Sequence, residues 1–432
     1  AITNLVSFLD NIMVGQLGTE QMSGVAIVNQ LIFVYNLAIF GAVSAASIFG
    51  AQYFGKGNHK GHMYSFRFKL YATLLVTGGA ILLFLTKGSA LISLYLTDTV
   101  GNGATDLALQ YGLEYLAIMM VGLIPFAVNQ SYATNIKETG QTFIPMLASF
   151  VAVGTNAILD YLMIFGIGPF PELGVQGAAL ATVIARYIEA LIVVIWAHIH
   201  RGKNRYLEGA YTGFGIPLAE LKAILIKGFP LMMNEVLWAA GMTTVTQCYS
   251  VRGLDVVAGL NIASTITNLF NIVYLQLGSC ISIVVGQYLG AGKLEDAKDA
   301  DNKMIVFSVF CCVIMAALMF VVGGFFPGIY NTTEEIRELA TSFIAVSAII
   351  MPFCAFSHAS YFTLRSGGKT VVTFLFDSVF TWVIVVPAAY LLAHFTGLGI
   401  VSIYFLVQGT ELIKVIIGYL MVKSNVWVVQ MV

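Results

Sequence analysis

Residues 50–57 read GAQYFGKG, and residues 285–292 read VGQYLGAG. The same offset of 235 residues aligns the longer segments 18–57 and 253–292 without a gap. Two further segments repeat later in the chain. Ile-Pro-Phe (124–126) matches Met-Pro-Phe (351–353), and Lys-Glu-Thr-Gly-Gln-Thr (137–142) matches Arg-Ser-Gly-Gly-Lys-Thr (365–370). The aligned identities include Gly18/Gly253, Gly24/Gly259, Asn36/Asn271, Ser44/Ser279, Gln52/Gln287, Tyr53/Tyr288, Gly55/Gly290 and Gly57/Gly292. The chain therefore consists of two related halves.

The composition indicates a helical membrane protein. Of the 432 residues, 58% are hydrophobic and only 10% are Asp, Glu, Lys or Arg, against about 25% charged residues in soluble domains. The mean hydropathy is +0.86, and apolar runs of roughly 20 residues recur, the length that spans a bilayer. A net charge of −1 argues against nucleic acid as a partner. The five cysteines lie in apolar runs without C-x-x-C spacing, which favours packing residues.

The hydropathy pattern predicts twelve transmembrane helices in two six-helix lobes. The N-lobe is 1–200, the cytoplasmic linker 201–220 and the C-lobe 221–432. Because six spans separate equivalent positions, both halves cross the membrane in the same direction, as in transporters with a parallel repeat. The predicted spans are 1–15, 22–54, 66–96, 106–136, 142–166, 174–200, 221–249, 257–289, 302–326, 336–364, 371–393 and 398–424.

The first apolar run is short. It reaches only from Ala1 to about Val14, less than a full span, so we expect the start of the first helix to be missing. A signal peptide is the alternative, although no basic segment precedes the run.

Basic residues predict the orientation. Sixteen flank even-numbered connections or the C-terminus, and only Lys87, Arg252 and Arg337 flank odd-numbered ones. Cytoplasmic loops carry the excess of Lys and Arg, so we expect the even-numbered loops and both termini to be cytoplasmic. The sixteen are Lys56, Lys60, Arg67, Lys69, Lys137, Arg201, Lys203, Arg205, Lys222, Lys227, Lys293, Lys298, Lys303, Arg365, Lys369 and Lys423.

Two basic residues lie deep within predicted spans, each three residues from an acid. Arg186 precedes Glu189, and Lys414 follows Glu411. This spacing places both charges on one helical face, so each is expected to neutralise its neighbour inside the bundle.

Four acids have no basic partner within their own predicted spans, namely Asp10, Asp160, Glu235 and Asp377. An unpaired carboxylate at membrane depth is costly, and acids retained there usually bind ions or substrates. We therefore expect an interior that attracts cations. The alternatives are hydration near the outer surface for Asp10 and an interfacial position for Glu235 and Asp377.

Asn156 and Asp160 lie four residues apart and share one helical face. A carboxylate and an amide oxygen suit Na⁺, and the carboxylate alone suits a proton; a polar pair that joins two helices is the alternative. His358 could titrate near neutral pH or serve as a packing residue.

Several motifs are absent from the sequence. It contains no G-x-x-x-x-G-K-[ST], H-E-x-x-H or G-x-S-x-G and no His/Cys cluster. We therefore predict no enzyme activity, no ATP drive and no cofactor, with Na⁺ or H⁺ as the coupling ion and no other metal.

The motifs together resemble the multidrug and toxic compound extrusion (MATE) family over essentially the whole chain. The resemblance rests on DNIMVGQLG (10–18), MSGVAI (22–27), NAILD (156–160), GVQGAALAT (174–182), GQYLGAG (286–292) and LRSGGKT (364–370). It implies two lobes in a V around a central cavity, and export of cationic and lipophilic compounds in exchange for Na⁺ or H⁺.

The resemblance also implies site residues. It assigns Asp10, Asn156, Asp160 and Thr182 to a cation site in the N-lobe. In one sodium-coupled branch it assigns Glu235 to the C-lobe, together with an acid of the tenth helix. This sequence has Cys354 near that place, and Asp377 of the eleventh helix is our candidate substitute.

We therefore predict a monomeric cation-coupled antiporter for small cationic or lipophilic compounds. One alternative is a lipid-linked precursor flippase of the same superfamily, which needs several basic residues to grip pyrophosphate. Others are a metabolite transporter of the major facilitator class, whose G-x-x-x-D-R-x-G-R signature is missing, and a channel or structural membrane protein.

Overall fold

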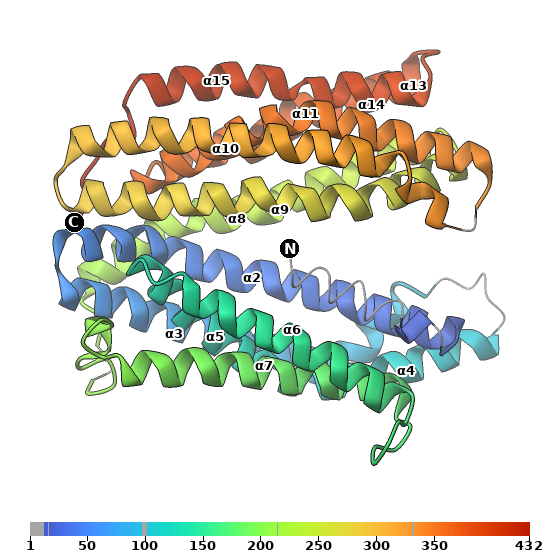
Figure 1. The fold of residues 1–432 in the computed structure, drawn as a ribbon, viewed down its shortest axis with the longest axis horizontal. Coiled ribbons are helices and arrows are strands. Elements are labelled where there is room, and N and C mark those ends of the chain that lie inside the picture. Colours follow the sequence, from blue (N-terminus) through green and yellow to red (C-terminus); the bar gives the residue numbers. More distant parts are fainter. Residues whose placement is uncertain (1–12, 16, 97–101, 214, 331) are drawn as a thin grey trace. The chain divides into compact units, whose positions relative to one another are not determined.

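The computed structural model describes residues 13–15, 17–96, 102–213, 215–330 and 332–432 (Figure 1). The first half forms α2 (Thr19–Lys56), α3 (His59–Ser93), α4 (Asn102–Val121), α5 (Leu123–Glu138), α6 (Phe143–Ile164), α7 (Gly174–Ile199) and the 3₁₀ turn η1 (Arg205–Leu207). The second half forms α8 (Leu218–Ser250), α9 (Leu254–Gly290), α10 (Leu294–Gly323), the 3₁₀ turn η2 (Phe326–Ile329), α11 (Glu334–Ser366), α12 (Thr370–Phe374), the π-helical segments η3 (Leu375–Val379) and η4 (Thr381–Val385), α13 (Val386–Phe395), α14 (Ile400–Gly409) and α15 (Glu411–Lys423).

The described part of the chain confirms an all-helical membrane fold. Ten helices within it are long and apolar enough to cross a membrane, and the bent pair of α4 and α5 makes an eleventh. No β-strand forms among these residues. A spanning helix satisfies its own backbone hydrogen bonds where no water is available. The predicted spans from 22–54 onward all coincide with these helices, and the first, 1–15, lies almost wholly outside the described residues.

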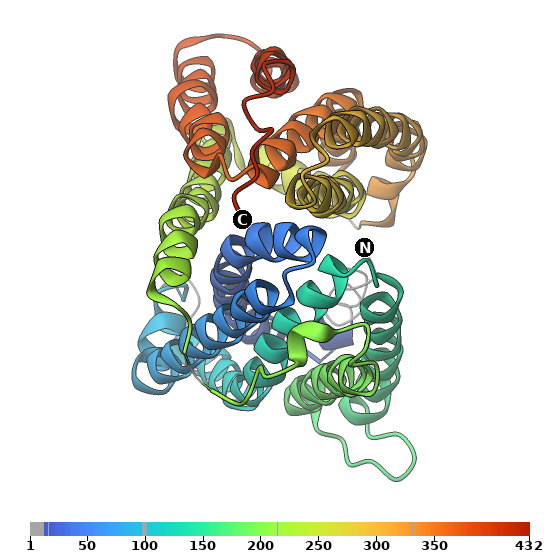
Figure 2. The same cartoon turned by 90° about the vertical axis from the view of Figure 1, so that its left-hand side faces the viewer.

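The helices gather into two compact units. The N-terminal unit contains residues 2–50 and 59–221, and the C-terminal unit contains 51–58 and 222–432. The last turns of α2 therefore belong to the C-terminal unit, and the predicted linker belongs to the N-terminal unit. Within each unit most helices run roughly parallel and are seen nearly end-on in Figure 2.

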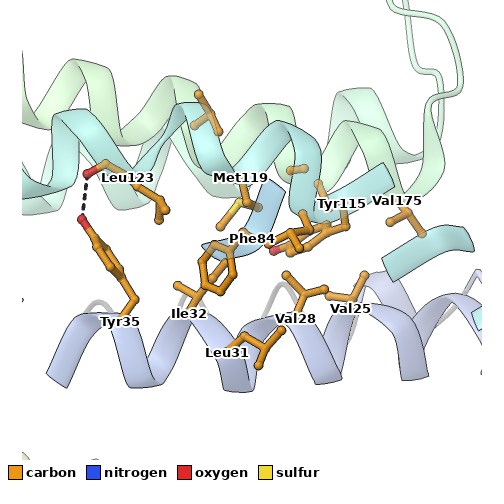
Figure 3. Close-up of a cluster of buried hydrophobic side chains, with 14 of the residues drawn as sticks. Val25, Val28, Leu31, Ile32, Tyr35, Phe84, Tyr115, Met119, Leu123 and Val175 are labelled. Atoms are coloured by element: carbon orange, nitrogen blue, oxygen red, sulfur yellow. Dashed lines mark hydrogen bonds between the residues drawn. The ribbon is translucent and has the colours of Figure 1, made fainter. Parts of the chain in front are cut away.

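Figure 3 shows the core of the N-terminal unit. Apolar side chains along α2 pack against Phe84 of α3 and Met119 of α4. At the end of this row the Tyr35 hydroxyl donates a hydrogen bond to the Leu123 carbonyl at 3.0 Å and lies 2.8 Å from the Thr77 hydroxyl. The hydroxyl is thus satisfied inside an otherwise apolar layer, as buried polar groups usually are.

A bend of 43° separates α4 from α5. Pro125 has no amide proton, so the carbonyl four residues earlier, that of Val121, loses its helical partner. Side chains of α7 reach this break, where the Tyr187 hydroxyl lies 3.5 Å from the Val121 oxygen and Arg186 Nη1 lies 3.4 Å from the Gly122 oxygen. The proline explains the break, and the Tyr187 hydroxyl approaches the Val121 carbonyl that the proline leaves free.

The repeated glycine motif ends two helices in the same way. Gly57 follows α2 with φ +73°, and Gly292 follows α9 with φ +74°. Glycine adopts this left-handed conformation without the steric cost of a Cβ, and it commonly stops helices.

Two further glycines of the motif let backbones meet within the C-terminal unit. A Cβ added to Gly55 would lie 1.9 Å from the Gln287 carbonyl oxygen, and one added to Gly290 would lie 1.9 Å from the Gln52 oxygen. The contacts are reciprocal because the two pairs are equivalent in the repeat. Small residues allow this close approach of helices in membranes.

Gln52 of α2 is fully buried in the C-terminal unit. Its amide nitrogen donates to the carbonyls of Ser366 and Val429 at 2.9 and 3.2 Å, and its oxygen accepts from the Met431 amide at 2.8 Å. The tail after α15 is therefore fastened to the end of α2.

The linker packs on the N-terminal unit. The guanidinium of Arg67 on α3 donates to the backbone oxygens of Gly209, Ala210 and Gly215 at 2.6, 2.9 and 2.7 Å. Tyr206 of η1 is fully buried, and burial raises the pKa of its hydroxyl well above the ordinary value. The linker is thus a packed segment of this unit.

Candidate functional site

Three of the four residues predicted for the N-lobe cation site lie in the described part of the N-terminal unit. Asn156 and Asp160 are buried on α6, with exposed fractions of 3% and 1%. The Asn156 amide donates to the Thr182 hydroxyl of α7 at 3.3 Å. The Asn156 oxygen is buried without a hydrogen-bond partner among the described residues. A carboxylate, an amide oxygen and a hydroxyl therefore come from two adjacent helices.

The fourth residue, Asp10, lies outside the described residues.

On α7, the Arg186 guanidinium lies over the ring of Phe126, 5.2 Å from the ring centroid. The carboxylate of Glu189 accepts from the Ser149 hydroxyl at 2.6 Å. The expected neutralisation of Arg186 by Glu189 stays a prediction.

A second polar cluster lies in the C-terminal unit around Asp377. Its Oδ1 accepts from Lys414 Nζ at 2.6 Å, and its Oδ2 accepts from the Asn234 amide at 2.9 Å. The prediction that Lys414 is neutralised by Glu411 was therefore wrong. Asp377 reaches the ammonium from another helix and forms the ion pair.

Asn234 anchors this cluster. Its oxygen accepts from the Ser378 hydroxyl at 2.7 Å and from the Ser378 amide at 3.2 Å. Its nitrogen lies 3.4 Å from the Tyr361 hydroxyl. Every polar atom of the Asn234 side chain is thus engaged, which fixes how its amide faces Asp377.

The two other candidates in this unit lie on α8 and α11. Glu235 is half-buried, directly after Asn234. His358 has Nδ1 3.0 Å from the Cys354 carbonyl, and its ring centroid lies 4.6 Å from that of Tyr274. Since a carbonyl only accepts, Nδ1 must carry a proton, and this geometry favours the packing interpretation of His358.

The structure also shows a buried charged cluster in the N-terminal unit that the sequence analysis missed. Lys69 Nζ lies 2.5 Å from Glu138 Oε1 and donates to the Asn135 oxygen. His62 Nε2 lies 3.2 Å from Glu138 Oε2. Lys69, Glu138 and Asn135 have exposed fractions of 0%, and His62 has 1%. The sequence pattern places Lys69 among the basic residues that flank a cytoplasmic connection and does not indicate its burial.

A second missed acid is Asp301 of α10. It is fully buried, and its Oδ1 accepts from the Thr363 hydroxyl of α11 at 2.5 Å. Asp301 lies in LEDAKDADNK, which has the composition of a solvated helix end.

Comparison with protein families settles the relationship. A sequence model of the MatE family matches residues 1–162 and again residues 230–391. The chain belongs to the MatE family. The two separate matches to one model agree with the internal repeat, so each half of this MatE chain is one copy of the family unit.

Curated relatives of this MatE protein extend over most of the chain. A probable multidrug resistance protein NorM from Thermotoga maritima is 23% identical over 400 residues, which are 92% of this chain and 83% of the relative. A protein of the same name from Halalkalibacterium halodurans is 24% identical over 396 residues, or 91% and 84% of the two chains.

Solved structures confirm the fold. An outward-facing multidrug resistance MATE family transporter of the MOP superfamily superposes with a TM-score of 0.88 at 19% identity, covering 98% of this chain and 92% of that chain. A MOP superfamily transporter from Pyrococcus furiosus gives a TM-score of 0.87 at the same identity and coverage. The chain is therefore an integral membrane protein with the MATE fold.

Proposed function

We propose that this chain is a cation-coupled antiporter that exports cationic or lipophilic compounds by alternating access. Membership of the MatE family and relatives named as probable multidrug resistance proteins support export of this kind. The observation that carries the proposal is the burial of Asn156 and Asp160 one turn apart on α6, with the Asn156 amide bonded to Thr182 on α7.

This arrangement suits a small cation. The Asn156 oxygen is buried and has no hydrogen-bond partner among the described residues, and a buried polar atom without a partner is costly. Na⁺ held by this oxygen and by the Asp160 carboxylate would satisfy it, and a proton on Asp160 is the other coupling ion that the site suits. We include Asp10 of the first predicted span as a further ligand in this proposal.

Coupling requires that the cation and the exported compound favour different states of the protein. A ligand shifts a conformational equilibrium only by its differential affinity for the two states. In the proposed cycle the cation neutralises the site from the outer side and drives the state that releases the exported compound. The cation then leaves toward the cytoplasm, where the acid regains its charge.

The test is transport by the purified protein in proteoliposomes. Efflux of a cationic dye is measured with a Na⁺ gradient and with a pH gradient, each imposed alone. We expect one of them to drive saturable export, and we expect Asp160→Asn and Asp10→Asn to lose that drive while retaining dye binding. Glu172→Gln, which changes an exposed loop acid of the same unit, is the matched control.

Unchanged ion dependence in Asp160→Asn would remove this residue from the coupling site. Dye export that neither gradient drives would count against antiport as a whole. Translocation of a pyrophosphate-linked lipid without dye export would favour the flippase. We further propose that the protein acts as a monomer in a bacterial plasma membrane, with both termini in the cytoplasm.

A further inference from the structure

The pairing of Asp377 with Lys414 leaves neither carboxylate oxygen without a partner. Oδ1 accepts from Lys414 Nζ at 2.6 Å, and Oδ2 accepts from the Asn234 amide at 2.9 Å. The exposed fractions of the Lys414 and Asp377 side chains are 8% and 15%. The ammonium is therefore held against a carboxylate in a region with little access to water.

Aromatic faces complete the surroundings of the ammonium. Lys414 Nζ lies 5.3 Å from the ring centroid of Phe376 and 6.0 Å from that of Phe380. Such rings attract a cation through their negative faces, more strongly where water is excluded. Glu411 lies one turn before Lys414, and its Oε1 is buried without a hydrogen-bond partner in the part of the chain that the structure describes. These groups together form a cation site, and the cation in it is a side chain.

Both helices that form the pair depart locally from regular α-helical geometry. Asp377 lies in the π-helical segment η3, and Lys414 lies in the first turn of α15, which follows an irregular turn at Thr410. Single π-helical turns occur frequently at functional sites. The ion pair therefore lies beside irregular backbone in both helices.

We propose that Lys414 is a tethered cation, whose ammonium permanently occupies the position where Asp377 would otherwise bind an exchangeable Na⁺ or proton. Asp377 is thereby withdrawn from ion coupling, and the transport cycle uses only the cation site of the N-terminal unit. This inference rests on the proposed antiport for its consequence in transport, but the occupancy of the site is independent of transport.

The other ionisable groups near the pair do not replace the ammonium. His358 of α11 has Nδ1 directed at the Cys354 carbonyl. The Tyr361 hydroxyl lies near the Asn234 amide. Arg365 of α11 interacts with Glu235 and with Tyr361, so it offsets the charge of Glu235, whereas Glu411 adds to the negative charge. Removal of Lys414 would thus leave the Asp377 and Glu411 carboxylates without their nearest cation, and they would attract one from solution.

The test compares cation binding by purified protein in detergent. Lys414→Met keeps the length of the side chain and removes its charge, so we expect the variant to bind one cation more per chain than wild type. Binding of ²²Na⁺ at equilibrium and potentiometric titration of bound protons report the two possible ions. The double variant D377N/K414M should return to the wild-type number, and Lys414→Arg, which keeps the charge, should match wild type.

A thermal measurement covers the case in which Lys414→Met folds poorly. Its melting temperature should rise with added Na⁺ or with acid by more than that of wild type, and this gain should vanish in D377N/K414M. Lys414→Gln, which keeps a hydrogen-bond donor, should show the same gain. Equal cation binding in wild type, Lys414→Met and Lys414→Gln would overturn the proposal, as would a gain that persists in the double variant. Failure of cation-driven export by wild type would instead refute antiport and leave this comparison intact.

Discussion

Removing Lys69 from the buried cluster of the N-terminal unit tests whether this ion pair governs the stability of the unit. Lys69 and Glu138 have exposed fractions of 0% and lie 2.5 Å apart, with Asn135 as a second acceptor for the ammonium. Lys69→Met keeps most of the side-chain volume and leaves the Glu138 carboxylate without its nearest cation.

Breaking a buried ion pair by removing one partner costs about 3–5 kcal/mol. His62 Nε2 lies 3.2 Å from the other carboxylate oxygen, so it compensates part of the loss and places the expected cost near the lower end. A loss of about 3 kcal/mol lowers the folding equilibrium constant by roughly two powers of ten. Replacing both charges removes the uncompensated ion, so K69M/E138Q should regain most of the stability lost by either single variant.

The assay is equilibrium unfolding of purified protein in mixed micelles with increasing dodecyl sulfate, followed by tryptophan fluorescence. A double-mutant cycle of wild type, Lys69→Met, Glu138→Gln and the double variant isolates the pair interaction. Lys60→Met changes an exposed lysine of the same helix and should stay within about 0.5 kcal/mol of wild type. The reasoning fails if Lys69→Met behaves like Lys60→Met, or if the two single losses simply add in the double variant.

Three further results are expected. Gly55→Ala should lose about 1–3 kcal/mol or more of unfolding free energy in the same assay, because its Cβ would meet a backbone oxygen at 1.9 Å. The control Gly154→Ala, whose Cβ would meet nothing within 4 Å, should be neutral or gain up to about 1 kcal/mol. Similar losses in the two variants would contradict the close helix crossing at Gly55. Asn156→Ala should weaken the cation that drives dye export about tenfold, equivalent to ~1.4 kcal/mol, and an unchanged half-saturating cation concentration would exclude Asn156 as a ligand. Gly202→Cys, in a background without the five native cysteines, should react with an impermeant maleimide only from the cytoplasmic side, and labelling from outside would reverse the topology.

Local patterns in the sequence were sufficient to predict the fold. Each span from 22–54 onward coincides with a helix, because hydropathy over about 20 residues reports directly on the length that a bilayer requires. The repeat was equally readable, since the glycines at which backbones meet and helices stop recur at one offset. Asn156 and Asp160 shared a helical face on spacing alone, whereas Thr182 came only from the family resemblance.

Ion pairs between helices could not be predicted in this way. Helical spacing assigned Lys414 to Glu411, but a pair three residues apart is a weak interaction, and Asp377 lies 37 residues away on another helix. Lys69 lies near a span end, where a lysine ordinarily reaches water, and only the packing of α3 against α5 shows that it is buried. The choice of partner depends on tertiary contacts that a single sequence does not display.

The burial of Gln52 has a consequence for biosynthesis. Its partner Met431 lies 379 residues later in the chain, so at about 5–20 residues per second the ribosome adds that partner roughly 20–75 s after Gln52. Until then the Gln52 side chain has only the Ser366 carbonyl as a partner, its oxygen has none of the backbone donors that satisfy it, and an unsatisfied amide in an apolar setting is costly. The C-terminal unit can therefore pack fully around Gln52 only after Val429 and Met431 have been made. A stop codon a few residues before Met431 should yield inserted protein that membrane proteases degrade faster than the longer chain.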